Sequence, residues 1–213
     1  MSDTDLRLYV IVDEPAAKGR PLEDIVRAAA AGGATAVQLR HKSGDTRAFL
    51  AAARSLRGVT RELGLPFIVN DRVDMALAVD ADGVHLGPDD MPAVLARQLL
   101  GPDKIIGAST GTVEEAHQAV AEGVNYLGVG AVFGTQSKAD AGDPIGPQGL
   151  KQIVSSVGVP VVGIGGITAH NAGEVIRAGA VGVAVISAIV SAADVAAAAR
   201  ALRQAINSEE SRR

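Results

Sequence analysis

The chain has 213 residues, a length that suits one large domain, and 47% of them are hydrophobic while only 2% are aromatic. With 20 basic and 24 acidic residues the net charge is −4, which argues against a nucleic-acid-binding protein because such proteins usually carry a basic excess. The absence of cysteine excludes disulfides, thiolate metal sites and a thiol nucleophile.

Short runs rich in β-branched residues alternate with longer amphipathic stretches along the whole chain. The predicted strands cover residues 8–13, 36–40, 66–71, 83–87, 105–109, 126–133, 159–166 and 182–189. The stretches between them have helical periodicity. Their expected boundaries are marked by a Thr112–Glu115 capping box, a similar Ser191–Asp194 start, first-turn Pro21 and Pro147, and Gly33, Gly64 and Gly123 at helix ends.

The order of these elements predicts the fold. Nearly continuous apolar strands indicate burial on both faces and therefore a parallel sheet. Eight strand–helix pairs predict an α/β protein with a single (β/α)₈ TIM barrel spanning residues 1–213, of which about 206–213 are expected to be a frayed tail. An open doubly wound sheet is the alternative, but the first strand is followed by DEPAAKG and no GxGxxG motif.

The segment VQLRHK, residues 37–42, ends the second predicted strand with charged residues. Side chains alternate along a strand, so Gln38, Arg40 and Lys42 should share the face toward the barrel mouth, and Leu39 and His41 the opposite face. Two converging cations suit an anion such as phosphate. The alternative is one salt bridge to the neighbouring strand and a solvated lysine.

Carboxylates follow the third and fourth predicted strands. Asn70 and Asp71 end the third, and Asp90 follows the fourth. Two carboxylates on adjacent strand ends can hold Mg²⁺, which prefers one or two carboxylates together with phosphate and water. The alternative is that Asp71 and Asp90 each cap the next helix.

The connection after the sixth predicted strand is long and rich in Gly and Pro, as in active-site lids. It carries Thr135, Ser137 and Lys138 but no Walker motif, and a plain solvated loop is the alternative. The loops after strands seven and eight are the usual phosphate site of these barrels, and here they carry Gly166 and Ser187.

The four histidines show no metal-ligand spacing and no Ser–His–Asp arrangement. We expect His85, inside the fourth strand, to be a hydrogen-bonded core residue. His117 and His170 lie in helical patterns and should be exposed.

Taken in order, these motifs resemble those of the thiamine-phosphate synthases. They lie on seven of the eight predicted strands and cover nearly the whole chain. The motifs are Gln38-Leu-Arg40-x-Lys42, Asn70-Asp71, the segment DGVHLGPDD at 82–90, Ser109-Thr110, Thr135-x-Ser137-Lys138, Ile164-Gly-Gly166-Ile and Ile186-Ser187.

The resemblance implies a transferase that couples a hydroxymethylpyrimidine diphosphate to a thiazole phosphate through a carbocation-like state and releases diphosphate. It implies that the pyrimidine diphosphate is bound by Gln38, Leu39, Arg40, His41, Lys42, Asn70, Ser109 and Lys138, with Arg40, Lys42 and Lys138 as catalytic cations. It assigns the thiazole phosphate to Thr135, Gln136, Ser137, Gly166, Ile186 and Ser187, and one Mg²⁺ per subunit to Asp71 and Asp90.

Some positions depart from the family pattern, namely His41, Pro88, Gly111 and Ser137. Two alternative functions on the same barrel are a thiazole tautomerase, which needs no carboxylate pair, and a non-catalytic sensor of phosphate ligands.

We also expect a cytoplasmic protein with small-molecule substrates, no nucleic-acid or membrane partner, and a homodimer as in similar proteins. The start of the chain lacks the apolar core of a signal peptide, and no apolar stretch is long enough to span a membrane.

Overall fold

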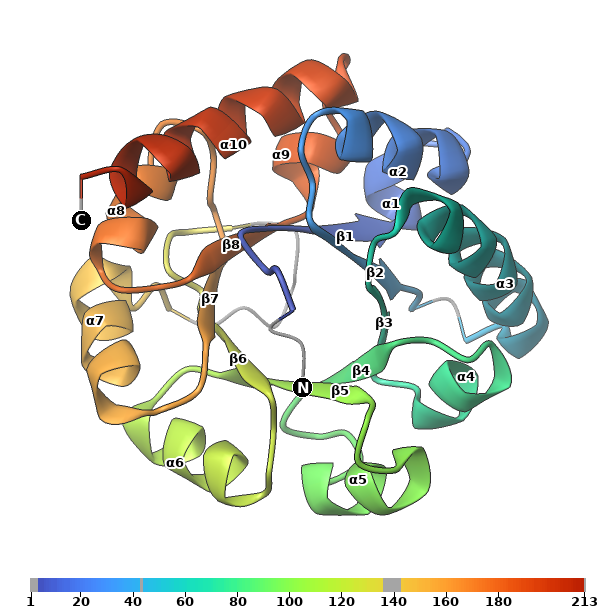
Figure 1. Cartoon of the computed structure of the whole chain (residues 1–213), viewed down its shortest axis with the longest axis horizontal. Helices are drawn as coiled ribbons and strands as arrows, with labels where there is room; N and C mark the ends of the chain where they lie inside the picture. Colours follow the sequence, from blue (N-terminus) through green and yellow to red (C-terminus); the bar gives the residue numbers. More distant parts are fainter. Residues whose placement is uncertain (1–3, 43, 136–142, 213) are drawn as a thin grey trace.

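The computed structural model describes residues 4–42, 44–135 and 143–212. Eight parallel strands close into a barrel in sequence order, because β1 pairs with both β2 and β8 (Figure 1). The strands are β1 Leu8–Asp13, β2 Ala36–Arg40, β3 Phe67–Asn70, β4 Gly83–Leu86, β5 Ile105–Thr110, β6 Tyr126–Val129, β7 Val161–Ile164 and β8 Gly182–Val185. The predicted TIM barrel is confirmed.

Helices surround the strands as an outer ring in Figure 1. They are α1 Glu14–Ala17, α2 Leu22–Ala31, α3 Thr46–Leu63, α4 Val73–Ala78, α5 Ala93–Leu100, α6 Val113–Ala121, α7 Gly146–Ser156, α8 Ala172–Arg177, α9 Ser187–Val190 and α10 Val195–Glu210. Within the described part of the chain, none of them is long and apolar enough to cross a membrane.

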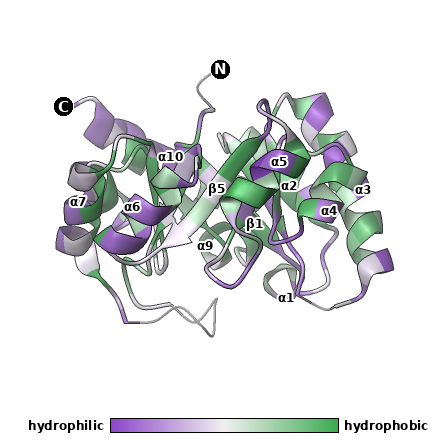
Figure 2. Ribbon diagram, turned by 90° about the horizontal axis from the view of Figure 1, so that it is seen from below, coloured by the Kyte–Doolittle hydropathy of each residue, from purple (hydrophilic) through white to green (hydrophobic). Residues whose placement is uncertain are grey.

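The barrel separates two hydrophobic cores, because successive strand side chains point to opposite faces. The larger core lies between the strands and the helices and includes Val10, Leu39 and Val69. The smaller one fills the barrel and includes Tyr9, Ile68 and Tyr126. In Figure 2 the outer helices carry both hydrophobic and hydrophilic colour, as expected of helices that bury one face against the strands. The inward-facing residues therefore form the inner core and, at the carboxyl ends of the strands, the predicted site.

Helix ends follow the predicted local chemistry in most places. The capping box of α6 is present, with the Thr112 hydroxyl accepting from the Glu115 N–H at 3.1 Å. Gly33, Gly64 and Gly123 have positive φ, as expected at helix ends. The predicted start at Ser191 is wrong, because Asp194 caps α10 while the Ser191 hydroxyl donates to the Ala16 carbonyl.

The C-terminal segment differs from the expected frayed tail. Helix α10 continues to Glu210, and Ile206 is fully buried against the outer core. Glu209 forms two ion pairs, with its Oε1 lying 2.7 Å from Arg177 Nη1 and 2.9 Å from Arg212 Nη1. Burial of Ile206 and this ion-pair cluster hold the last turns of the helix on the barrel.

Candidate active site

Arg40 and Asp13 form an ion pair at the carboxyl ends of neighbouring strands. The strand register places them side by side, and Arg40 Nη1 lies 2.5 Å from Asp13 Oδ2. Both side chains are largely buried, at 14% and 8% exposed. Asp13 also caps α1, because its Oδ1 accepts from the Ala16 N–H at 3.3 Å. The sequence alternative of a salt bridge to the neighbouring strand is thus correct for Arg40, and the bridge fixes the guanidinium at the barrel mouth.

Lys42, Asp71 and Asp90 form a second charged group beside the first. Lys42 Nζ lies 2.5 Å from Asp71 Oδ2, and the carboxyl group of Asp90 faces that of Asp71. Burial raises the pKa of Asp90 above its usual value, and the facing Asp71 carboxyl raises this pKa further. Lys42 is 53% exposed, in agreement with the alternative of a solvated lysine, but it also forms an ion pair with Asp71.

Neither aspartate of this pair caps a helix. The N-cap of α4 is Arg72 and that of α5 is Pro92, and neither cap residue makes a side-chain hydrogen bond. Asp90 Oδ2 instead accepts from the Gly87 N–H at 2.7 Å, and Asp71 adopts a left-handed conformation with φ of 64°. A non-glycine residue rarely takes this conformation, so the backbone here is set by the site rather than by a helix start.

The carboxylate pair fits a magnesium ion by donor type. Mg²⁺ is usually held by one or two carboxylates, with phosphate oxygens and water completing its shell. Two facing carboxyl groups of which one has a raised pKa also gain electrostatically from a cation between them. Across residues 4–42, 44–135 and 143–212, no group of three or more His, Cys, Asp or Glu side chains could hold a metal. A Mg²⁺ at Asp71 and Asp90 would take its remaining ligands from water or phosphate oxygens.

Three uncharged polar residues of the predicted site line the barrel interior below these charges. Gln38 and Asn70 are buried, at 2% and 7% exposed, while Ser109 is partly exposed. Gln38 Nε2 donates to the Tyr9 hydroxyl at 2.7 Å, and His85 Nε2 lies 2.9 Å from Ser109 Oγ. His85 is a buried, hydrogen-bonded residue, as expected from the sequence.

Leu39 and His41 lie on the other face of the second strand. Leu39 is fully buried in the outer core. The His41 ring stacks on Phe49 of α3 with centroids 5.0 Å apart, and its Nδ1 lies 3.4 Å from a Glu14 carboxylate oxygen. Since both side chains point toward the helices, any contact of theirs with a ligand in the mouth would have to come from backbone atoms.

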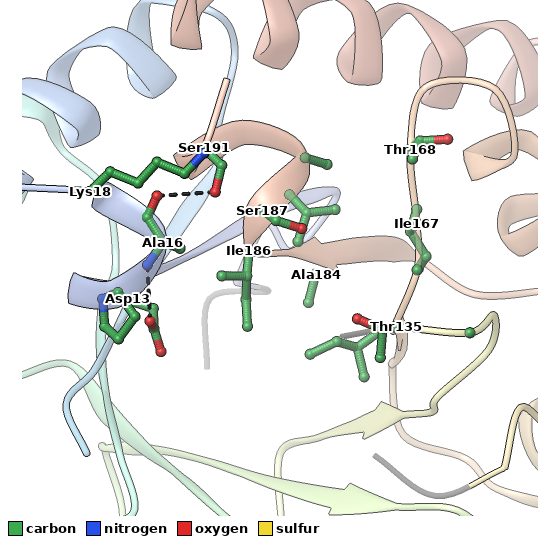
Figure 3. A pocket seen from close by; sticks show the side chains of 17 residues that line it. Asp13, Ala16, Lys18, Thr135, Ile167, Thr168, Ala184, Ile186, Ser187 and Ser191 are labelled. Atoms are coloured by element: carbon green, nitrogen blue, oxygen red, sulfur yellow. Dashed lines mark hydrogen bonds between the residues drawn. The ribbon is translucent and has the colours of Figure 1, made fainter. Parts of the chain in front are cut away.

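A cavity of about 670 Å³ opens at the same end of the barrel, between the turn of α1 and the loops after β6, β7 and β8 (Figure 3). Four of the residues assigned to the thiazole phosphate line it: Thr135, Gly166, Ile186 and Ser187. Asp13 lines it as well, which places the cavity directly beside the Arg40 ion pair. The two predicted anion sites are therefore adjacent.

Gly166 cannot be replaced in this cavity without a clash. Its φ is 63°, and an added Cβ would lie 2.4 Å from the Gly134 carbonyl oxygen and 2.8 Å from Phe133 Cβ. The missing side chain lets the loop after β7 pack closely on the loop after β6. Ser187 begins the four-residue helix α9, so the cavity has the strand-seven and strand-eight loops and the short extra helix that phosphate sites of these barrels use.

Two charged residues of the site were missed in the sequence. Asp13 ends β1, and the rule that polar strand ends face the mouth would have found it. Lys18 lies just after α1 and is the one cation among the described residues lining the cavity. Gln136, Ser137 and Lys138 lie outside the described residues.

Comparison with known proteins gives consistent results along the chain. A family model described as thiamine monophosphate synthase matches residues 8–189. A thiamine-phosphate synthase of Moorella thermoacetica is 56% identical over 199 residues, covering 93% of this chain and 95% of that protein. A thiamine-phosphate synthase of Chloroflexus aurantiacus is 53% identical over 203 residues, covering 95% and 94%.

A solved structure shows the same architecture. The thiamine phosphate pyrophosphorylase of Pyrococcus furiosus superposes with a TM-score of 0.89 at 48% identity, covering 97% of this chain and 98% of that one. The similarity thus extends over both groups of charges and the cavity beside them.

Proposed function

The chain belongs to the thiamine-phosphate synthase family and is a transferase of that activity, and from this premise we propose that the barrel mouth holds its two substrates in two adjacent sites. The pyrimidine diphosphate would occupy the mouth over β2, β3 and β5, and the thiazole phosphate the cavity beside it. The observation that carries this assignment is the Lys42–Asp71–Asp90 group next to the Arg40–Asp13 pair.

The pyrimidine diphosphate site combines cations at the rim with polar groups below. Arg40 offers a guanidinium that can bind phosphate oxygens with two parallel hydrogen bonds, and Lys42 offers a mobile ammonium. Gln38, Asn70 and Ser109 supply amide and hydroxyl groups on the inner wall. Lys138 remains a predicted third cation of this site.

The thiazole phosphate site has a different character. Thr135 and Ser187 offer hydroxyl groups to the cavity, and Gly166 allows close approach of a phosphate to the backbone. Gln136 and Ser137 remain predicted members of the same site. Because the cavity shares Asp13 with the Arg40 pair, a thiazole bound there would lie next to the diphosphate-bearing carbon of the other substrate.

Asp71 and Asp90 would hold one Mg²⁺ per subunit. A magnesium ion bound there would supply Lewis-acid stabilisation of negative charge on the diphosphate. The exposed pair of Lys42 with Asp71 is weak, since such pairs contribute roughly 0–1 kcal/mol. Lys42 can therefore leave Asp71 for a phosphate oxygen at little cost when the substrate arrives.

We propose a dissociative substitution. The carbon–oxygen bond to the diphosphate breaks with both electrons remaining on oxygen, and Arg40 and Lys42 stabilise the negative charge that develops there. The lone pair of the thiazole nitrogen then forms the new carbon–nitrogen bond at the electron-poor methylene carbon. The thiazole is held in reach by its own phosphate, so proximity replaces activation by a general base. Each ~1.4 kcal/mol of charge stabilisation corresponds to a tenfold gain in rate.

Asparagine substitutions at Asp71 and Asp90 test the metal assignment. Asp71→Asn and Asp90→Asn should each lower diphosphate release by about a hundredfold or more, because Lewis-acid stabilisation is worth several kcal/mol. The measurement is diphosphate release from both substrates over a Mg²⁺ titration, with EDTA as the metal-free reference. Asp89→Asn is the matched control, since Asp89 is an exposed neighbour of the same charge.

The expected pattern is a loss of both rate and Mg²⁺ response in the two site variants, and neither loss in the control. Turnover within twofold of the unmodified protein in Asp71→Asn and Asp90→Asn, with the same Mg²⁺ requirement, would contradict the assignment.

The homodimer and the cytoplasmic location also remain predictions. Sedimentation velocity of the whole chain measures the first and fractionation of the source cells the second.

A further inference from the structure

A chain of hydrogen bonds crosses the inside of the barrel and joins two residues of the proposed pyrimidine diphosphate site. Gln38 Nε2 donates to the Tyr9 hydroxyl at 2.7 Å, and the Tyr9 and Tyr126 hydroxyl oxygens are 3.0 Å apart. The Tyr126 hydroxyl lies 2.9 Å from His85 Nδ1, and His85 Nε2 lies 2.9 Å from Ser109 Oγ. The chain links β2 to β5 through β1, β6 and β4, across the width of the barrel.

The barrel interior is shaped to hold these rings. An added Cβ on Gly107 would lie 2.1 Å from the Tyr126 ring, and one on Gly128 would lie 3.0 Å from the His85 ring. The two tyrosine rings meet edge to face with centroids 6.0 Å apart, and His85 lies 5.4 Å from Tyr126. Two strands thus give up side chains at inward positions to make room for a polar chain in an otherwise apolar core.

In one donor direction of this hydrogen-bond chain, both tyrosine hydroxyl protons have an acceptor within the four contacts. An amide nitrogen only donates, so Tyr9 accepts from Gln38 and turns its own proton to Tyr126. Tyr126 then donates to His85 Nδ1, and a neutral His85 with its proton on Nε2 donates to Ser109. Burial raises the pKa of both phenols, so both keep the protons that this arrangement needs.

This direction decides what Ser109 can offer to a ligand. Its oxygen accepts from His85, so its own hydroxyl proton points elsewhere, and the side chain is partly exposed at the mouth. A serine hydroxyl that points its proton toward the site can donate a hydrogen bond to an anionic ligand, whereas one that donates to histidine cannot.

We propose that Tyr126 and His85 are positioning residues that direct the Ser109 hydroxyl proton toward the bound pyrimidine diphosphate, with Gln38 and Tyr9 setting the direction of the chain. The inference rests on the proposed function, because it takes Ser109 as a ligand of that substrate. It adds that three residues buried inside the barrel, none of them assigned to either substrate, determine the donor state of the site.

Removal of the Tyr126 hydroxyl should reverse the last bond of the chain. In Tyr126→Phe, the hydroxyl that donates to His85 Nδ1 is removed, so the ring proton can move to Nδ1 and Nε2 can then accept from Ser109. The Ser109 proton then turns inward, and the ligand loses the same hydrogen bond that Ser109→Ala removes. The effects of Tyr126→Phe and Ser109→Ala on kcat/KM should therefore not be additive in free energy.

A double-mutant cycle in steady-state kinetics measures this coupling. Tyr126→Phe and Ser109→Ala should each lower kcat/KM for the pyrimidine diphosphate by about tenfold, the factor that one lost hydrogen bond to a charged group supplies. The double variant should be no slower than Ser109→Ala alone, and the KM for thiazole phosphate should stay unchanged in all three. Ile68→Val is the matched control, since it shortens an inner-core side chain outside the hydrogen-bond chain; it should lower Tm but leave both KM values unchanged.

Each contrary result has a distinct meaning. If the two effects multiply in the double variant, to about a hundredfold, Tyr126 does not act through Ser109 and the proposal is overturned. Unchanged kinetics in Ser109→Ala would remove Ser109 from the substrate site and overturn the proposal with it. The unmodified protein, run alongside with both substrates, reports on the proposed function separately from either result.

Discussion

At the scale of single residues, the two paired cations of the mouth differ in how firmly they are held. The Arg40 pair with Asp13 is largely buried and supported by the strand register, so the guanidinium is fixed before substrate arrives. The Lys42 pair with Asp71 is half exposed, so its ammonium can follow the substrate. In the proposed site, one cation would therefore provide preorganised charge and the other would adjust to the bound phosphates.

Lys18 offers a test of the cavity at the same scale. Lys18→Ala should raise the KM for thiazole phosphate by about two- to fivefold, because an exposed cation contributes roughly 0.2–1 kcal/mol to an ion pair. The KM for pyrimidine diphosphate should not change. Steady-state kinetics with each substrate varied in turn measure both values, and Lys151→Ala on the exposed face of α7 removes an equal charge away from the cavity. Equal changes in the two KM values would show that Lys18 does not act on the thiazole phosphate.

At the scale of elements, the helices depend on local caps that the sequence makes visible. Thr112→Ala should lower the free energy of unfolding by about 1 kcal/mol, because it removes the hydroxyl that accepts from the first turn of α6. Urea denaturation measures the loss. Thr112→Ser keeps the hydroxyl and should retain most of the stability; an equal loss in both variants would show that the cap contributes nothing.

The strand ends show how far the sequence predicts these elements. The ranges of β1 and β2 agree with the apolar runs, but the sixth strand ends at Val129 although the run continues to residue 133. Beyond Val129 the chain is no longer assigned to the strand, and the N–H groups of Val132 and Phe133 donate to the carbonyls of Ile164, the last residue of β7, and of Gly165, which follows it. Burial in a loop and burial in a strand give the same apolar run, so hydrophobicity alone cannot distinguish them.

At the scale of the whole molecule, the sequence predicted the positions of the charged rim residues better than the contacts inside the barrel. Polar residues at strand ends must face the mouth of such a barrel, and this rule located Arg40, Lys42 and Asp71 without a structure. It gave no information on which interior side chains meet. Tyr9 and Tyr126 are 117 positions apart, and the meeting of their hydroxyls depends on closure of the sheet rather than on any local pattern.

Two glycine substitutions compare the interior of the barrel with its surface. Gly107→Ala should lower the free energy of unfolding by about 1–3 kcal/mol or more, because the new methyl group overlaps the Tyr126 ring. Gly58→Ala lies within α3 with open space around it and should raise stability by about 0.5–1 kcal/mol. Urea denaturation of both variants tests the contrast. A stable Gly107→Ala protein would mean that the tyrosine chain can be displaced at little cost.

The placement of the tyrosines has an optical consequence. The protein contains two tyrosines and no tryptophan. The hydroxyl groups of both tyrosines belong to the series of hydrogen bonds beneath the proposed pyrimidine pocket. Tyrosine fluorescence and the tyrosine bands of the near-ultraviolet circular dichroism spectrum therefore report on that one location. Occupancy of the pocket should be visible as a spectral change in the native protein, without any attached dye.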